Sequence, residues 1–212
     1  TSPIEEFSKK NKINLKNPIE LNSAEELKIF KGLSPDIVIV VAYGQIIPKS
    51  FLNIAKFGFI NIHASLLPKW RGAAPIQRAI MNGDKKIGIS IMKIEEELDS
   101  GPVLVSQEIE LDQNATHGEI EKKLSLMGAS LLIENLKKLE KGNLKFINQL
   151  HSEATYAKKI SKSETKINWF LDANKVLAHI HGLSPSPGAW FEHDNERFKV
   201  LRANKFSASG NP

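Results

Sequence analysis

The chain alternates short apolar runs with segments that carry helix-start signals, and this alternation restricts the fold more than any other feature. Four runs rich in Ile and Val have the length of strands and cover residues 36–43, 58–64, 86–94 and 102–111. Helical patterns occupy 48–55 and 74–83, and Thr116 with Glu119 begins a longer one that continues to about residue 142. The unbroken first run is typical of a strand covered on both faces. Together these segments predict an α/β fold, with a Rossmann-like, open, mostly parallel sheet and helices on both faces.

The pattern changes in the last third of the chain. Residues 151–168 are polar and predict a linker, 171–183 form a helical pattern, and "HDNE" at 193–196 is typical of a hairpin turn. We therefore expect one domain over 1–150, and a linker with the beginning of a second domain over 151–212.

Composition excludes several classes of site. The chain of 212 residues has no cysteine, which rules out disulfides, thiolate catalysis and cysteine-bound zinc. No apolar run has the length of a membrane span, and the charged start has no secretory signal, so we expect a cytoplasmic protein or one of an organellar matrix. The net charge is +5, and residues 151–212 carry nine basic and six acidic groups. This more basic part is either an ordinary solvated surface or a contact for an anion such as nucleic acid.

Polar side chains interrupt the second apolar run at the end of its predicted strand. Asn61 and His63 are two residues apart and so point to the same face, and Ser65 follows in the same alternation. Open α/β sheets bind ligands at this end of their strands. The strand over 86–94 leads to Asp99, which returns toward His63 if the two strands are neighbours. A carboxylate orients a nearby imidazole, and an Asn amide can donate to a developing oxyanion.

Three chemistries compete for this set, and each residue alone could equally be a satisfied structural group. Ser65, His63 and Asp99 could form a hydrolytic triad, although the serine lacks the Gly-x-Ser-x-Gly elbow. His63 and Asp99 could bind a metal, although no further ligand has a recognisable spacing. The third chemistry is direct transfer between two bound substrates, with Asn61 as oxyanion donor and the His–Asp pair as proton handler. It requires no thiol, metal or covalent intermediate.

Two longer stretches are distinctive as wholes: "NIHASLLPKWRGAAPIQRAI" at 61–80 and "LDSGPVL" at 98–104. They resemble the folate-dependent formyltransferase family, and the similarity extends to 35–52 and 154–169, so that it covers nearly the whole chain. Within the family, "RGAAPIQ" and the basic segment after residue 150 are most similar to the members that act on charged initiator tRNA. The resemblance implies transfer of a formyl group from 10-formyltetrahydrofolate to the α-amino group of methionyl initiator tRNA, through a tetrahedral intermediate, in translation initiation.

The resemblance also implies roles for particular residues. Asn61, His63 and Asp99 would be catalytic: the amide and imidazole would hold the oxyanion, and the carboxylate would orient the imidazole and route a proton. The folate would lie in a loop formed by Ser65, Leu66, Leu67 and Pro68. From their charge, Arg71 and Arg78 are candidates for contact with the tRNA end or the anionic folate tail, or are simply solvated arginines beside the loop. Lys158, Lys159 and Lys162 are candidates for contact with tRNA phosphates. No metal would take part.

The family's enzymes are longer at both ends. The resemblance therefore implies that the opening strands of the catalytic domain are missing and that a small, OB-like β-barrel domain for tRNA is represented only by its beginning. The full-length protein would be a monomer without a membrane partner. Three alternatives stay open: a related folate-dependent formyltransferase for another amine, a hydrolase that releases formate from formyl-folate, and a noncatalytic folate- or RNA-binding module.

Overall fold

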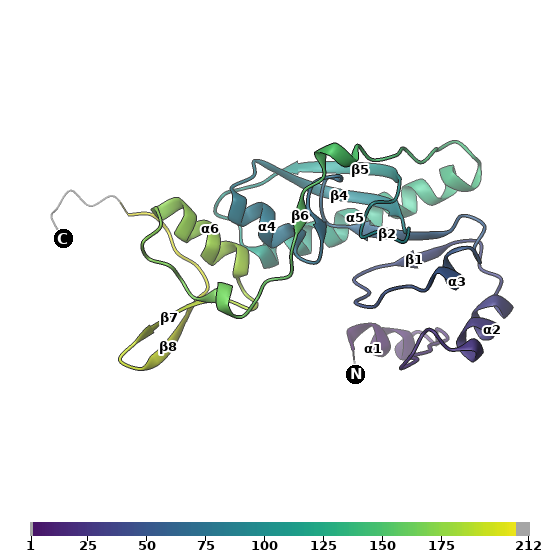
Figure 1. Ribbon diagram of the computed structural model, residues 1–212, viewed down its shortest axis with the longest axis horizontal. Coiled ribbons are helices and arrows are strands. Elements are labelled where there is room, and N and C mark those ends of the chain that lie inside the picture. Colours follow the sequence, from purple (N-terminus) through teal and green to yellow (C-terminus); the bar gives the residue numbers. More distant parts are fainter. Residues whose placement is uncertain (1, 207–212) are drawn as a thin grey trace. The chain divides into compact units, whose positions relative to one another are not determined.

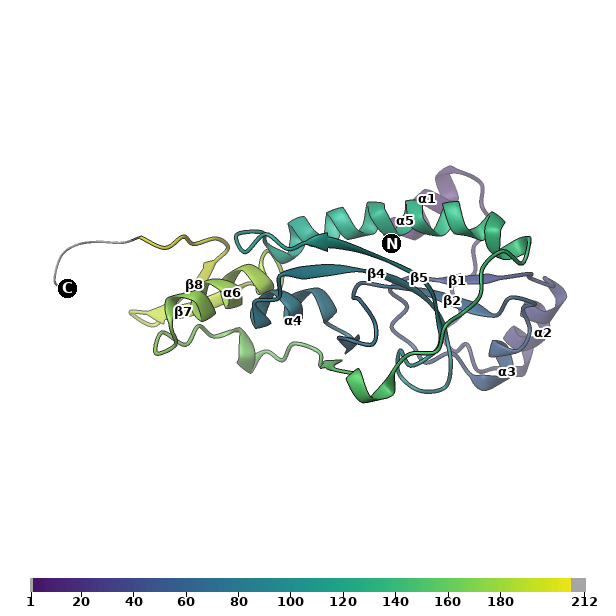
Figure 2. The ribbon, with the colours of Figure 1, turned by 90° about the horizontal axis from the view of Figure 1, so that it is seen from above.

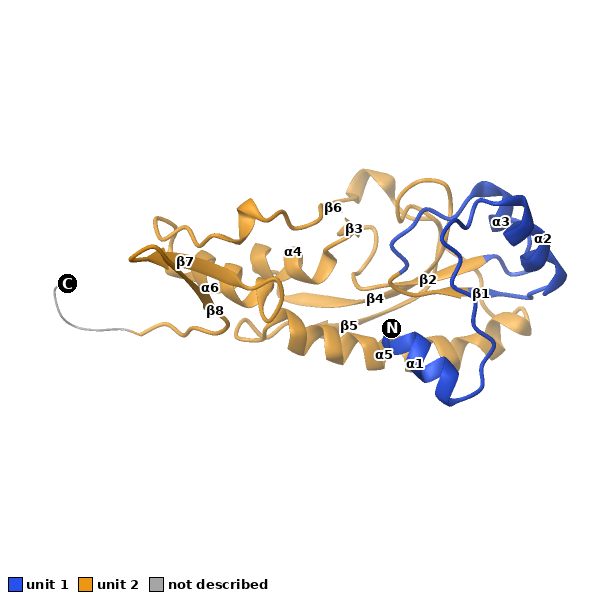
Figure 3. Ribbon diagram, turned by 90° about the horizontal axis from the view of Figure 1, so that it is seen from below, with its two compact units in different colours: residues 1–38, 43–58 blue, residues 39–42, 59–212 orange. Residues whose placement is uncertain are grey.

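A computed structural model of the chain describes residues 2–206 (Figure 1). The chain forms two compact units, one of residues 1–38 and 43–58 and the other of residues 39–42 and 59–212 (Figure 3). The first unit contains α1 (Pro3–Lys10), α2 (Ala24–Gly32) and α3 (Lys49–Leu52). The rings of Phe30 and Phe51 lie 5.3 Å apart within it, and Phe51 is fully buried. An aromatic pair therefore forms the centre of this unit.

A sheet of four strands forms the frame of the second unit, in the order β1-β2-β4-β5. Its strands are β1 (Val38–Val40), β2 (Phe59–His63), β4 (Lys86–Lys93) and β5 (Val103–Glu110). The pairings of β2 with β4 and of β4 with β5 are both antiparallel. The predicted α/β class is confirmed, but the sheet is mixed and the expectation of a mostly parallel sheet is wrong. The direct loop between β4 and β5 accounts for the second of these pairings, because antiparallel neighbours need no crossover helix.

The first apolar run forms a much shorter strand than its composition predicts. Of residues 36–43, only Val38–Val40 are a strand, and the backbone of Ala42 has a φ of 49°, in the left-handed region. Within the strand Ile39 is 36% exposed, so this strand is not covered on both faces in the described part of the chain. The prediction of an enclosed strand is therefore wrong here.

Helices cover both faces of the sheet, as predicted (Figures 2 and 3). α5 (His117–Glu140), which begins at the Thr116–Glu119 capping box, packs closely on one face: a Cβ on Gly128 would lie 2.9 Å from Cγ2 of Ile62. α4 (Pro75–Asn82) lies on the opposite face and ends at Gly83, whose φ is 73°. None of the helices within residues 2–206 combines the length and apolarity that crossing a membrane requires.

The segment after residue 148 is more ordered than a polar linker. It contains the one-turn helices His151–Glu153 and Ser163–Thr165 and the strand β6 (Tyr156–Ala157), which pairs in parallel with β3 (Arg71–Gly72). The segment predicted to be a linker over 151–168 is thus ordered, because it packs against the loops that follow β2.

The C-terminal part has a small core of its own. α6 (Ala173–Leu183) and the hairpin of β7 (Ala189–His193) and β8 (Glu196–Val200) surround it, as the sequence predicts. Its buried members are Ile167, Ile180, Leu183 and Ala189. Within residues 2–206 this part contains the two-stranded hairpin and no closed barrel.

Candidate active site

The structure brings His63 and Asp99 together. β2 carries Asn61 and His63 on the face of the sheet that points away from α5, and Asp99 lies in the loop between β4 and β5. Nδ1 of His63 is 3.7 Å from Oδ2 of Asp99, so the two form an ion pair when the imidazole is protonated. The side chain of His63 is 6% exposed and that of Asp99 16%. Asp99 is therefore the member of the pair that a ligand reaches more easily.

A backbone carbonyl sets the tautomer of His63. Nε2 lies 2.9 Å from the carbonyl oxygen of Trp70, which can only accept, so Nε2 carries the proton and donates it. In the neutral imidazole the lone pair is then on Nδ1, on the side of Asp99. Trp70 is held in turn by the bond from its Nε1 to Asp84 (2.8 Å) and by the hydroxyl of Thr155, which accepts from its backbone N–H (2.9 Å). No pattern in the sequence indicated this role for Trp70.

The hydroxyl of Ser90 holds the loop that was predicted to bind folate. Ser90 lies opposite His63 in the pairing of β2 with β4 and is fully buried. Its hydroxyl donates to the carbonyl of Ser65 (2.7 Å) and accepts from the backbone N–H of Leu67 (3.1 Å). Leu66, Leu67 and Pro68 are half-buried, and the bond between Leu67 and Pro68 is cis. The loop thus offers apolar surface beside the polar pair.

The geometry does not favour the triad or the metal site. The hydroxyl of Ser65 donates to the carbonyl of Lys69 at 2.6 Å, and no hydrogen bond joins it to His63 in the described residues. A nucleophilic serine needs such a bond to its base. In the part of the chain that the structure describes, no further His, Asp or Glu joins His63 and Asp99 in a group that could hold a metal ion.

The amino-acid sequence matches two protein-family models. The model described as formyl transferase matches residues 1–136, and the model of the formyl transferase C-terminal domain matches residues 159–212. The chain belongs to the formyl transferase family.

Curated relatives extend over the whole chain. It is 50% identical over 210 residues to the methionyl-tRNA formyltransferase of Pelagibacter ubique, with 99% of this chain and 68% of that protein covered. Its identity to the enzyme of the same name from Parvibaculum lavamentivorans is 43% over 215 residues, with coverages of 100% and 69%. The chain thus spans about two thirds of the length of these relatives.

Solved structures support the formyl transferase fold. The methionyl-tRNA formyltransferase from Clostridium thermocellum matches with a TM-score of 0.72 at 22% identity, over 95% of this chain and 87% of that one. HypX from Aquifex aeolicus, solved in complex with tetrahydrofolic acid, matches with a TM-score of 0.67 at 20% identity, over 81% of this chain and 30% of that one. The fold of this formyl transferase is therefore shared with proteins that differ widely in sequence.

The basic residues predicted to contact tRNA or folate have different environments in this formyl transferase. Arg71 is only 2% exposed, and its Nε and Nη2 donate to the side-chain oxygen of Gln149. Arg78 forms an ion pair with Glu164 at 2.7 Å and donates to the carbonyl of Lys158. The side chains that remain exposed are those of Lys158, Lys159 and Lys162. Both arginines thus serve internal contacts, whereas the lysines face outward.

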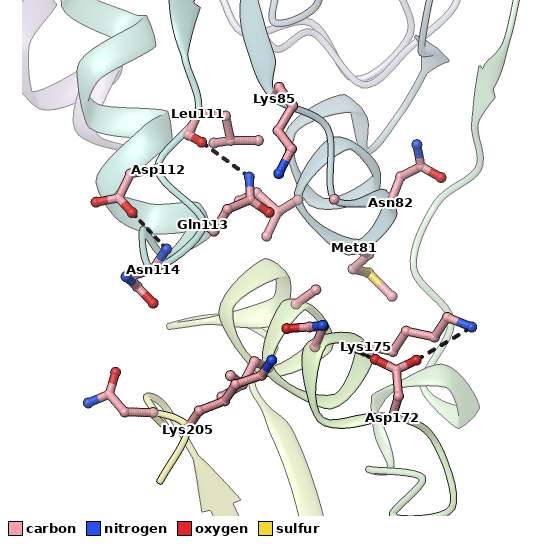
Figure 4. A pocket seen from close by; sticks show the side chains of 16 residues that line it. Met81, Asn82, Lys85, Leu111, Asp112, Gln113, Asn114, Asp172, Lys175 and Lys205 are labelled. Carbon is pink, nitrogen blue, oxygen red and sulfur yellow. Dashed lines mark hydrogen bonds and ion pairs between the residues drawn. The ribbon is translucent and has the colours of Figure 1, made fainter. Parts of the chain in front are cut away.

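Of two hollows in the second unit, one lies away from the predicted site and the other lies beside the Ser65–Pro68 loop. The larger, of about 760 Å³, lies where α4, the segment 111–114 and α6 meet, and none of the predicted site residues lines it (Figure 4). A smaller one of about 390 Å³ is lined by Ser65, Leu66 and Trp70 on one flank of the folate loop, but not by Asn61, His63 or Asp99. The predicted catalytic residues and the larger hollow are therefore separate features of the molecule.

Removing the Ser90 hydroxyl should loosen the folate loop. In Ser90→Ala the carbonyl of Ser65 and the N–H of Leu67 lose their buried partner, which should lower the free energy of unfolding by about 1–3 kcal/mol in urea titrations. Hydrogen exchange at the Leu67 amide should become faster. The control is Ser106→Ala, because the Ser106 hydroxyl contacts Ser90 but not the loop. Equal losses in both variants would contradict this assignment.

The Arg78–Glu164 pair predicts a loss of stability in acid. Hydrogen bonds from Arg78 and from the backbone of Ser161 lower the pKa of Glu164 from 4.5 to about 2. Because the pKa is lowered in the folded state, the stabilisation is complete above about pH 4.5 and disappears as the pH falls to about 2. In urea unfolding, Glu164→Gln should be less stable than wild type at about pH 7 and equal to it near pH 2. A difference that stays constant over this range would contradict the prediction.

Proposed function

We propose that the full-length protein transfers a formyl group from 10-formyltetrahydrofolate to the α-amino group of methionyl initiator tRNA, for translation initiation. The observation that carries this proposal is the His63–Asp99 pair, which lies on the Asn61 face of β2 beside a half-buried Leu-Leu-Pro loop. The curated relatives named methionyl-tRNA formyltransferase support the choice of substrate. The reaction would take place in the compartment where initiator tRNA is charged, the cytoplasm or an organellar matrix.

The Ser65–Pro68 loop suits one face of a flat, partly apolar ligand. Pockets for such ligands combine apolar walls with a few placed polar groups. Leu66, Leu67 and Pro68 supply half-buried apolar surface, and the carbonyl of Ser65 and the N–H of Leu67 are already satisfied by Ser90. The loop is therefore held in shape before any ligand binds. We assign the binding of the folate to these residues, and the fold shared with a HypX structure that holds tetrahydrofolic acid is consistent with it. The bound folate supplies the formyl group.

Each of the three polar residues has its own role in the transfer of the formyl group: Asn61, His63 and Asp99. Attack by the amine places negative charge on the formyl oxygen, and the Asn61 amide donates a hydrogen bond to it. His63 donates its Nε2 proton to Trp70, so the neutral imidazole has no free N–H for the oxyanion, and we do not give it the oxyanion-holding role that the family resemblance implied. Nδ1, on the Asp99 side, can instead take the proton of the attacking amine. The Asp99 carboxylate then stabilises the imidazolium. The new N–C bond is complete in the tetrahedral adduct; as the adduct collapses, the proton passes to the departing folate nitrogen and the old N–C bond breaks.

Loss of the Asn61 amide should strongly lower kcat and leave the affinity for folate nearly unchanged. Removal of one oxyanion donor typically costs about a hundred- to a thousandfold in kcat, and we expect Asn61→Ala to show that loss with nearly unchanged affinity for the folate. Rates of formyl-methionyl-tRNA formation and equilibrium binding measure the two effects. The exposed Asn143→Ala is the control. Wild-type kcat in Asn61→Ala would contradict the proposed site.

The same assay separates the alternative functions. We expect formyl-folate to be consumed only when charged initiator tRNA is present. Formate release without tRNA would indicate a hydrolase, product formation with another amine would indicate a related transferase, and neither product would indicate a noncatalytic binding module.

The outward lysines should contribute to tRNA binding through its phosphates. Replacing Lys158, Lys159 and Lys162 together by Gln should weaken tRNA binding and reduce the slope of log affinity against log salt by about 0.7–0.9 for each phosphate that is no longer neutralised. The control makes the same charge change on α5, at the exposed Lys122, Lys123 and Lys137. An unchanged slope in the first variant would contradict the proposed binding of phosphate by these lysines. In this proposal Arg78 supports the lysine segment from within, since it binds the carbonyl of Lys158.

A further inference from the structure

One side chain connects the loops of the candidate site. Gln149 is 7% exposed and uses both ends of its amide. Its Nε2 donates to the carbonyl of Asp99 at 2.9 Å and to that of Gly101 at 2.7 Å. Its Oε1 accepts from Nε and Nη2 of Arg71, at 3.1 and 2.8 Å. Gln149 therefore ties the loop of the catalytic carboxylate to the segment that follows the folate loop.

The loop that Gln149 holds is not self-supporting. Asp99 has a φ of 47°, a left-handed conformation that costs free energy in residues other than glycine and persists only where neighbours fix it. A Cβ on Gly101 would lie 2.0 Å from the carbonyl oxygen of Lys93, so the loop passes very close to β4. The backbone N–H of Gly72 donates to Oδ2 of Asp99 at 2.8 Å. This bond orients the carboxylate, whereas Gln149 fixes the backbone that carries it.

The same segment also fixes the partner of His63. Thr155 accepts from the N–H of Trp70 through its hydroxyl and from the N–H of Arg71 through its carbonyl, both at 2.9 Å. These bonds hold the Trp70 carbonyl against Nε2 of His63. Residues 149–155 thus support both members of the pair, Asp99 through Gln149 and His63 through Thr155.

The positive charge of Arg71 strengthens the hydrogen bonds that the Gln149 amide donates to the Asp99 loop. In the described part of the chain its guanidinium has no carboxylate partner, and its bonds go to Gln149 and, at 3.5 Å, to Nδ1 of His151. A cation that binds the oxygen of an amide polarises the amide and strengthens the bonds its N–H groups donate. Arg71 therefore both orients Gln149 and reinforces its hold on the Asp99 loop.

We propose that Gln149, oriented by Arg71, is a positioning residue that holds the catalytic carboxylate of Asp99 beside His63. Residues 149–155, which connect the sheet-containing part of the chain to its C-terminal part, then help to position the groups of the active site. This inference rests on the role of Asp99 in the proposed function. A displacement of about 1 Å at a reacting group can cost about a hundredfold in rate, so loss of the Gln149 bonds should lower kcat and leave the affinities for both substrates nearly unchanged.

The test uses Gln149→Glu in the full-length protein. A carboxylate keeps the acceptor for Arg71 but donates to neither carbonyl. We expect kcat to fall between about tenfold and a hundredfold, with KM for formyl-folate and for charged tRNA within about twofold of wild type. The matched control is Gln113→Glu, because the more exposed Gln113 also donates from Nε2 to two carbonyls, those of Asp84 and Leu111, outside the site. Its kcat should not change.

A double-mutant cycle with Asp99→Asn separates positioning from general stability. If Gln149 acts through Asp99, Gln149→Glu should lower kcat much less in the Asp99→Asn background than in wild type. Equal effects in both backgrounds, or a wild-type kcat in Gln149→Glu, would overturn the inference. Full activity of Asp99→Asn alone would instead refute the proposed function of the site.

A second, neutral variant distinguishes a loss of positioning from a failure to fold. Gln149→Met has a similar size and lacks all four bonds, and we expect it to fold cooperatively with a lowered kcat and the same dependence on Asp99. If neither Gln149 variant unfolds cooperatively in urea, the residue is structural and the inference is wrong.

Discussion

The antiparallel pairing of β2 with β4 determines which face carries Asn61 and His63 and where Ser90 lies. His63 lies opposite Ser90 and Asn61 opposite Met92. Because strand side chains alternate, a shift of one residue would turn Asn61 and His63 toward α5 and expose the apolar set of β2 on the other face. The same register places the Ser90 hydroxyl under the folate loop. The face that carries Asn61 and His63 and the position of the Ser65–Pro68 loop are therefore both set by one ladder of backbone hydrogen bonds.

One member of the His63–Asp99 pair and the residue that binds the other member adopt conformations that must be held by neighbouring groups. Trp70 and Asp99 have φ values of 61° and 47°, and each binds groups from the segment that follows Asn148. Such strain persists only where several bonds determine it together. The pairing of β3 with β6 and the bonds of Gln149 supply them. The geometry of the candidate site thus depends on residues that come much later in the chain.

The sequence predicted the local features better than the long-range ones. Periodicity and capping predicted α4, α5, β2 and β4, and the alternation of Asn61 and His63 predicted a shared face, because these depend on neighbouring residues. The direction of the β2–β4 pairing was not predicted, since apolar runs do not record which neighbour they pair with. Gln149 and Ser90 have no local pattern at all. Their importance comes from hydrogen bonds to loops 48 and 25 residues away.

The central claim is that Asn61, His63 and Asp99 converge on the group transferred beside the Leu-Leu-Pro loop. A crystal structure of the full-length protein with a nonreactive analogue of 10-formyltetrahydrofolate tests it directly. The account predicts the pterin ring against Leu66, Leu67 and Pro68, with the formyl oxygen within hydrogen-bond distance of the Asn61 amide. An analogue bound in the hollow between α4 and α6, with its formyl group remote from His63 and Asp99, would contradict it.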